Sequence, residues 1–199
     1  MTNESTIFKI NETGQGNLLI SQPSKKGESR LKYGLNIILP LDVDLGIIKV
    51  ETPSLIIRNK EELERLGVMF SLGNKYSTFV EKEESYFTDL HSSLRNYSLE
   101  IIVPDNANVK EIFIEDHAEK EVAYDLIIKI GDNCNLNIIE KSNGNTKFRS
   151  QIVDLHIGSN SHVNYITFQN LGNSFNHSIK RGVCDKDSHL NWTDIHIGG

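Results

Sequence analysis

The chain has 199 residues and a formal net charge of -6 at pH 7. This length suits one domain with an appended region, and an acidic chain without a run of Lys and Arg argues against a nucleic-acid partner. No apolar stretch approaches the roughly 18 residues of a membrane-spanning helix, and the first residues are polar, unlike a secretory signal. With only two cysteines, no disulfide framework is expected, so we predict a cytoplasmic protein that binds neither nucleic acid nor membrane.

Residues 1–97 predict a small α+β region with short strands followed by two short helices. Apolar and β-branched runs bounded by turn residues indicate the strands. These runs are Thr6–Ile10, Leu18–Ile20, Leu35–Leu39, Gly46–Val50 and Leu55–Ile57.

The first helix is expected over Lys60–Leu66, with Asn59 as its N-terminal cap and Gly67 just past its end. The second is expected from about Glu83 to Leu94, because its apolar positions recur at helical spacing. Those positions are Phe87, Leu90 and Leu94.

From about Ser98, four segments align without gaps at a spacing of 27 residues. They are Ile101–Ile114, Ile128–Lys141, Leu155–Phe168 and Gly182–Ile195. A fixed period of this size indicates a repeat architecture, and each unit has strand composition. We therefore predict a mainly β fold, a right-handed parallel β-helix of 27-residue coils over residues 98–199.

The repeat places equivalent residues in columns. The columns are Val109, Leu136, Val163 and Leu190 (apolar); Asn106, Asn133, Asn160 and Asp187 (turn); Ala107, Cys134, Ser161 and Ser188 (small); and Lys110, Asn137, Asn164 and Asn191 (polar). Because stacked coils lie about 4.8 Å apart, members of a column should be direct neighbours.

Strand alternation also predicts which columns face the interior. Inward positions are Ile101, Ile128 and Leu155, with Val103, Ile130, Ile157 and Cys184; outward positions are Ile102, Lys129, His156 and Val183. The last coil ends at Ile197–Gly199 without a capping element, so we expect another subunit, or further sequence, to cover that end.

Three residues are candidate metal ligands: Cys184, His162 and His189. Cys184 belongs to an inward column, which favours a buried and inert thiol over a metal ligand. His162 and His189 share a column, so they should stack and could bind one metal ion, or could continue a solvated polar ladder with Asn108 and Asn135. The sequence contains no phosphate loop or catalytic triad order, which indicates that the chain is not an enzyme.

Several motifs resemble the SufB/SufD family. Ile130–Glu140 reads IGDNCNLNIIE, similar to a coil of that family, and Ile157–Asn170 reads IGSNSHVNYITFQN, similar to the next coil with its terminal QN. His177–Thr193 (HSIKRGVCDKDSHLNWT) resembles the family's K-R-G-x-C…W-T segment, and Tyr86–Leu94 followed by Leu99–Pro104 resembles its F-x-x-L…V-P segment. The resemblance covers roughly residues 85–199.

The resemblance implies a scaffold component of iron–sulfur cluster assembly that forms a dimer and has a SufC-type ABC ATPase and a SufB/SufD subunit as partners. No cofactor is expected on this chain alone; the cluster belongs to the assembled complex. Cys184 matches the cysteine of the K-R-G-x-C motif, whereas Ser142 stands where SufB proteins tend to carry a cysteine.

Two alternatives remain open from the sequence. One is a structural β-solenoid that binds a protein through its flat face. The other is a β-helix enzyme acting on polysaccharide, which the lack of a stacked acidic column disfavours.

Overall fold

The computed structural model describes residues 54–198 except 76, 78, 82, 83, 96, 147 and 173, together with five short strands before residue 54. These strands are β1 (Ile7–Ile10), β2 (Gly16–Leu19), β3 (Glu28–Arg30), β4 (Asn36–Ile38) and β5 (Ile48–Lys49). The strand β3 was not predicted, whereas β1, β2, β4 and β5 coincide with expected strands, and the fifth expected strand is β6 (Ser54–Ile57).

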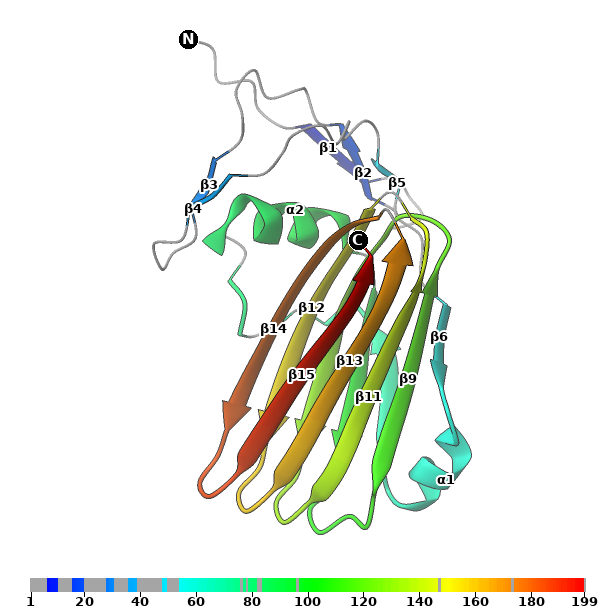
Figure 1. Cartoon of the computed structure of the whole chain (residues 1–199), viewed down its shortest axis with the longest axis vertical. Coiled ribbons are helices and arrows are strands. Elements are labelled where there is room, and N and C mark those ends of the chain that lie inside the picture. The colour runs from blue at the N-terminus through cyan, green and yellow to red at the C-terminus, as the bar shows by residue number, and fades with distance from the viewer. Residues whose placement is uncertain are drawn as a thin grey trace.

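Two five-stranded sheets form a β-solenoid of about four turns, which confirms the predicted mainly β fold (Figure 1). Sheet 1 has the order β14-β12-β10-β8-β7, and sheet 2 has the order β15-β13-β11-β9-β6. The strands of sheet 1 are β7 (Met69–Gly73), β8 (Tyr97–Val103), β10 (Val122–Ile130), β12 (Phe148–Ile157) and β14 (Phe175–Cys184). The remaining strands of sheet 2 are β9 (Glu111–Ala118), β11 (Asn135–Gly144), β13 (His162–Gly172) and β15 (His189–Gly198).

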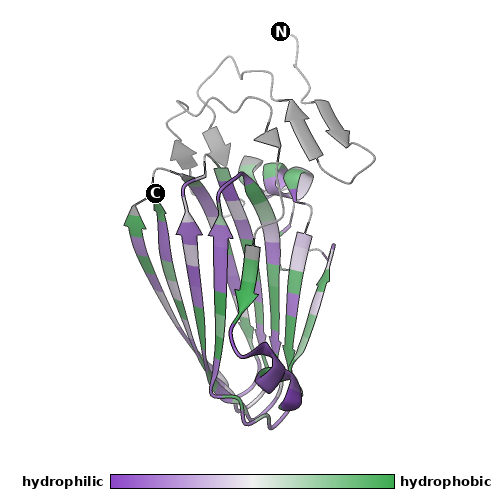
Figure 2. Ribbon diagram, turned by 90° about the vertical axis from the view of Figure 1, so that its right-hand side faces the viewer, coloured by the Kyte–Doolittle hydropathy of each residue, from purple (hydrophilic) through white to green (hydrophobic). Residues whose placement is uncertain are grey.

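Successive coils pair in parallel at the predicted register of 27 residues. Leu136 lies opposite Val163, and Val163 opposite Leu190, so the apolar column stacks as expected. The inward columns fill the interior, where Ile101, Ile128 and Leu155 are each no more than 1% exposed. Figure 2 shows the resulting alternation of hydrophobic and hydrophilic residues along the strands.

The tight turns between the sheets repeat the same backbone conformation in every coil. Asn106, Asn133, Asn160 and Asp187 have φ angles of 58°, 55°, 56° and 57°. Asn and Asp tolerate this left-handed conformation better than other residues with a side chain. The Asn133 side chain also donates to Asn106 Oδ1 at 3.1 Å, so the turn column is linked from coil to coil.

Gly131, in one of these turns, is required by close approach of the preceding coil. A Cβ atom added there would lie 2.5 Å from the backbone nitrogen of Asp105. Asp132 N donates to Asp105 Oδ1 at 2.8 Å across the same gap. The glycine therefore allows the turns to stack as closely as the strands do.

Two antiparallel strands and a short helix extend the solenoid at its N-terminal side. Strand β6 pairs with β9, and β7 pairs with β8. Between them, α1 (Lys60–Arg65) forms as predicted, and Gly67 follows it with a φ of 89°. Asn59 occupies the N-cap position as expected, but it adopts a left-handed conformation and its side chain makes no capping hydrogen bond. The division between residues 97 and 98 stays a prediction.

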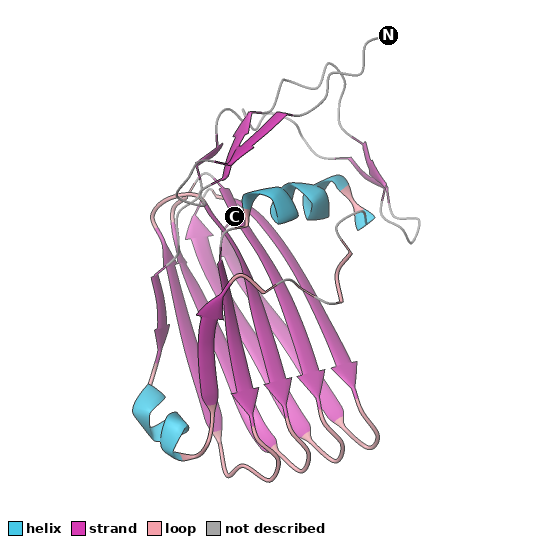
Figure 3. Cartoon of the chain, turned by 180° about the vertical axis from the view of Figure 1, so that it is seen from behind, coloured by secondary structure: helices cyan, strands magenta, loops and turns pink. Residues whose placement is uncertain are grey.

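The second helix, α2 (Tyr86–Leu94), lies across the outer face of sheet 1 (Figure 3). It begins at Ser85, whose side chain accepts from Thr88 N while Thr88 Oγ1 accepts from Ser85 N; the sequence analysis missed this capping box. Leu90 and Leu94 pack on Ala123 and Phe148, as the helical spacing predicted. α2 covers the first part of β12, and Ser77 and Phe79, which precede α2, hydrogen-bond to Asp154 further along the strand. β12 is therefore buried on both sides, whereas β13 in sheet 2 alternates between buried and exposed residues.

Cys184 is exposed, so the prediction of a buried thiol is wrong. Its register is as expected, since Cys184 lies opposite the buried Ile157. However, β14 is the last strand of sheet 1, and no further coil of the described structure covers its inward positions. Inward direction alone therefore does not bury a side chain in the last coil.

Within the described residues, none of the helices has both the length and the apolar composition needed to cross a bilayer.

A buried polar network as the candidate functional site

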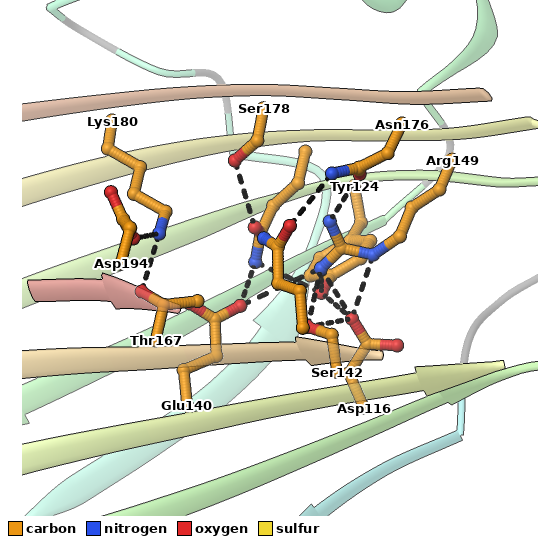
Figure 4. Close-up of polar contacts among 12 residues, drawn as sticks. Asp116, Tyr124, Glu140, Ser142, Arg149, Thr167, Asn176, Ser178, Lys180 and Asp194 are labelled. Carbon is orange, nitrogen blue, oxygen red and sulfur yellow. Dashed lines mark hydrogen bonds and ion pairs between the residues drawn. The ribbon is translucent and has the colours of Figure 1, made fainter. Parts of the chain in front are cut away.

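The interior of the solenoid holds a network of polar and charged side chains. Sheet 2 contributes Asp116 from β9, Glu140 and Ser142 from β11, Thr167 and Gln169 from β13, and Asp194 from β15; sheet 1 contributes Tyr124 from β10, Arg149 and Gln151 from β12, and Asn176, Ser178 and Lys180 from β14. These side chains converge between the two sheets (Figure 4). The interior between the two sheets therefore has an apolar region and, further along the strands, a polar region.

Arg149 is the centre of the network and is 0% exposed. Its Nη2 atom lies 2.6 Å from Asp116 Oδ2, and its Nε atom lies 3.1 Å from the same oxygen. Nη2 also donates to Tyr124 Oη at 2.9 Å and to Ser142 Oγ at 3.0 Å. A buried guanidinium needs such partners, because its planar donors would otherwise lose their hydration without compensation.

Asp116 and Tyr124 complete this half of the network. Asp116 is 0% exposed, and its Oδ2 accepts from Tyr124 Oη at 2.5 Å and from Ser142 Oγ at 3.2 Å. Tyr124 Oη in turn accepts from Gln151 Nε2 at 3.0 Å. Each of these hydroxyl groups both donates and accepts, so the guanidinium, the phenol and the carboxylate form one connected system.

Glu140 is the second buried carboxylate. It accepts from Tyr165 Oη at 2.6 Å and from Gln151 Nε2, and it lies 3.7 Å from Arg149 Nη2. One guanidinium thus faces two carboxylates in an interior that excludes solvent. Such an arrangement is stable only when hydrogen bonds satisfy the remaining charge, as the phenol and the amide do here.

Burial shapes the protonation of the network. Burial raises the pKa of Tyr124 and of Tyr165 well above the ordinary value, so both phenols remain hydrogen-bond donors. Burial acts to lower the pKa of Arg149, but its interactions with the carboxylates of Asp116 and Glu140 and with Tyr124 more than compensate and leave this pKa above its ordinary value. The guanidinium is therefore permanently charged.

A second ion pair continues the network into the last coil. Lys180 Nζ donates to Thr167 Oγ1 at 2.5 Å and pairs with Asp194. Burial acts to raise the pKa of Asp194, but the hydrogen bond and the charge of Lys180, together with the hydrogen bond from Thr167, outweigh it, and this pKa lies below its ordinary value. Arg149 reaches the same coil through Asn176, whose Oδ1 accepts from Arg149 Nη1 at 3.1 Å.

Three buried atoms of this interior have no hydrogen-bond partner among the described residues. They are Asp116 Oδ1, Gln169 Nε2 and Trp192 Nε1. The other amide atom of Gln169 is engaged, since Oε1 accepts from Asn176 Nδ2 at 2.8 Å. Buried polar groups are normally paired, so these atoms are where the network can accept or donate a further hydrogen bond.

The sequence analysis missed this network because its columns mix residue types. Asp116, Ser142 and Gln169 share one column, and Glu140, Thr167 and Asp194 share another. No two acids stand on adjacent coils in either column, so neither is the stacked acidic column that was sought. The available signal was parity, because these polar residues have the same parity as the apolar inward residues that precede them on their strands.

The predicted metal-ligand residues lie away from the network. His162 on β13 and His189 on β15 are exposed neighbours, and their rings stack with centroids 4.7 Å apart. Cys184 lies on β14, in the other sheet. No group of three or more His, Cys, Asp or Glu side chains in the described part of the chain is arranged to hold a metal ion.

A second buried polar cluster lies outside the solenoid, beneath α2. His91 Nε2 lies 2.8 Å from Asp125 Oδ1, and His91 Nδ1 lies 2.8 Å from Ser150 Oγ. Ser150 Oγ also lies 3.0 Å from His177 Nδ1. Arg95 Nη1 donates to Asp125 Oδ2 at 2.9 Å. The cluster fixes α2 to strands β10, β12 and β14.

Comparison with known families adds to this geometry. Residues 113–199 match the sequence model of the SufBD core domain of the SUF system of FeS cluster assembly. The match supports assignment of this part of the chain to the SufB/SufD family. The resemblance noted from the motifs is thereby confirmed over these residues. Searches of curated proteins and of solved structures found no match.

All twelve residues drawn in the interior network fall within the SufBD core segment, from Asp116 to Asp194. Ser142, where SufB proteins tend to carry a cysteine, lies inside the network and hydrogen-bonds to Arg149. The match supports involvement of the chain in SUF iron–sulfur cluster assembly.

Proposed function

We propose that this chain is a SufB/SufD-like scaffold component of iron–sulfur cluster assembly and is not catalytic by itself. The observation that carries the proposal is the SufBD core match over residues 113–199. The buried network lies wholly within that segment and joins strands β9 to β15. A scaffold needs a rigid framework, and the hydrogen bonds and ion pairs of this network connect the two sheets across the interior.

The position of the carboxylates supports a scaffold over a polysaccharide-active enzyme. Asp116 and Glu140 are each 0% exposed and point between the two sheets. A glycosidase needs its two carboxyl groups on either side of a bound sugar. Buried carboxylates that pair with Arg149 do not offer that arrangement.

The iron–sulfur cluster is the cargo of the proposed assembly. A usual cluster is held by four Cys thiolates, whereas this chain has two cysteines, of which Cys134 is buried. We therefore predict that the isolated chain does not retain a cluster. After anaerobic reconstitution and desalting, visible absorbance and iron and sulfide analysis should give less than one cluster per chain; a stoichiometric cluster on the isolated chain would contradict this.

The proposed partners are a SufC-type ABC ATPase and a second SufB/SufD subunit, in a cytoplasmic and dimeric assembly. Co-expression of the tagged chain with both partners tests the proposal. We expect the ATPase or the subunit to co-purify with the chain at fixed stoichiometry.

The test variant is Arg149→Met, which removes the centre of the network. Its matched control is Lys60→Met, on the exposed surface of α1. Circular dichroism first establishes that each variant is folded. Co-purification of neither partner with the wild-type chain would overturn the proposal and favour a solenoid that binds some other protein.

A further inference from the structure

The outer face of sheet 2 carries a pair of stacked histidines. His162 on β13 and His189 on β15 lie opposite each other in the parallel register. Their ring centroids are 4.7 Å apart, and the ring planes differ by 16°. Both side chains are exposed, so both imidazoles can be reached from solvent.

These two imidazoles differ from histidines whose ring nitrogens bond to other side chains of the chain. His91 is buried and hydrogen-bonded through both ring nitrogens, and His156 Nε2 lies 3.1 Å from Asp185 Oδ2. For His162 and His189, no side-chain hydrogen bond to another described residue is formed. Their ring nitrogens are therefore available to an external ligand.

The backbone beneath the pair is held at a fixed spacing. His162 N donates to Cys134 O, and His189 N donates to Ser161 O, each at 2.8 Å. Two residues further along the strands, the amides of Asn137, Asn164 and Asn191 form a ladder with hydrogen bonds of 2.9 Å. A donor pair on such a support loses little conformational freedom when it binds a ligand.

We propose that His162 and His189 form a binding site for a divalent transition-metal ion of the Zn²⁺, Ni²⁺ and Cu²⁺ group. Imidazole is a preferred ligand of these ions. Two nitrogens at about 2.0–2.1 Å from a tetrahedral ion are about 3.3 Å apart. The ring centroids lie 4.7 Å apart, so binding of one ion by both rings requires a rotation of these exposed side chains. This site lies outside the interior network and does not depend on the proposed function.

The neighbouring side chain in the same column can supply a third ligand. Asn135 on β11 lies opposite His162 and is exposed. Its amide oxygen, together with solvent, can complete the coordination of an ion held by the two imidazoles. Because the ligands come from adjacent strands, the bound ion would tie β15 to β13.

The test measures Zn²⁺ binding to the full chain by competition with a chromophoric chelator. We expect one Zn²⁺ per chain for the wild type, and an affinity lower by about tenfold or more for His162→Asn and for His189→Asn. The matched control is His117→Asn, which removes an exposed histidine on β9 and should leave the affinity unchanged.

Amide hydrogen exchange supplies a readout that nonspecific binding would not give. Zn²⁺ should slow exchange in β15 of the wild type and of His117→Asn, but not in His162→Asn. The proposal is overturned if the wild type binds no Zn²⁺, or if the variant lacking both His162 and His189 binds it as tightly as the wild type.

Discussion

Arg149 is the residue on which the interior depends most. Replacing it with Met would leave Asp116 and Glu140 buried without a cation. Breaking a buried ion pair by removal of one partner costs about 3–5 kcal/mol, since the remaining charge is unpaired. We therefore expect Arg149→Met to lower the free energy of unfolding by about that amount, measured by chemical denaturation at neutral pH.

The control for this substitution is Lys60→Met, which breaks the exposed pair of Lys60 and Glu64 within α1. Exposed pairs at this helical spacing contribute about 0.3–0.5 kcal/mol. Equal losses for both variants would show that the network contributes little to stability.

The two cysteines should differ in reactivity. Cys184 is exposed, whereas Cys134 is 1% exposed and its Sγ lies 3.3 Å from Pro104 O. A thiol reagent should therefore label Cys184 in the folded protein and Cys134 only after unfolding. Cys134→Ala should cost about 1 kcal/mol or less, since Ala107 already occupies the same column. Rapid labelling of Cys134 in the native chain would contradict its burial.

At the residue scale, the sequence was informative wherever a column repeated one property. The Asn turn column and the apolar column of Leu136 and Val163 were predicted correctly, because every coil demands the same backbone angle or the same buried volume there. The interior network was not predicted, because each coil contributes a different polar type. Its members satisfy one another across the two sheets, and that pairing is a property of the tertiary structure.

At the scale of the elements, α2 packs against a partly buried histidine of β14, since the rings of Phe87 and His177 have centroids 5.2 Å apart. Burial, together with the nearby His91, lowers the pKa of His177 from 6.5 to about 4. In the unfolded chain His177 binds a proton at higher pH than in the fold. The contribution of His177 to the free energy of unfolding is therefore intact above about pH 6.5. It declines as the pH falls toward 4, by up to about 1.4 kcal/mol per pH unit.

His177→Gln should reduce this decline, because a neutral amide does not titrate. The measurement is the free energy of unfolding at several pH values between 4 and 7 for the wild type and the variant. His117→Asn, which changes an exposed histidine, serves as the control and should keep the pH dependence of the wild type. Identical curves for the wild type and His177→Gln would show that other groups cause the decline.

The elements also show where sequence patterns suffice and where they do not. The helical spacing of Leu90 and Leu94 predicted α2, because an apolar stripe must be buried against something. That α2 lies on sheet 1 follows from contacts such as that between His91 and Ser150, which are distant in sequence. The cap at Ser85 carried a sequence signal, since Thr88 stands three residues later. The sequence analysis nevertheless placed the start of this helix at about Glu83.

At the scale of the whole molecule, the sheet edges should govern association. Strands β14 and β15 are the last of their sheets and have ten residues each, whereas β6 and β7 at the other edges have four and five. Short edge strands discourage pairing with another chain, and long ones favour it. Val183, Ile195 and Ile197 add exposed apolar surface to the long edges. We therefore expect the 199-residue chain to self-associate through β14 and β15.

Light scattering across a concentration series measures this association. The wild type should exceed the mass of a monomer as concentration rises, and Ile195→Lys should weaken the association by about tenfold or more, since charges on edge strands oppose pairing. The matched control is Ile56→Lys on β6, which is 52% exposed at the opposite edge of the same sheet and should leave association unchanged. If Ile56→Lys weakens association and Ile195→Lys does not, the contact uses the other edge; a monomer at every concentration would exclude self-association through either edge.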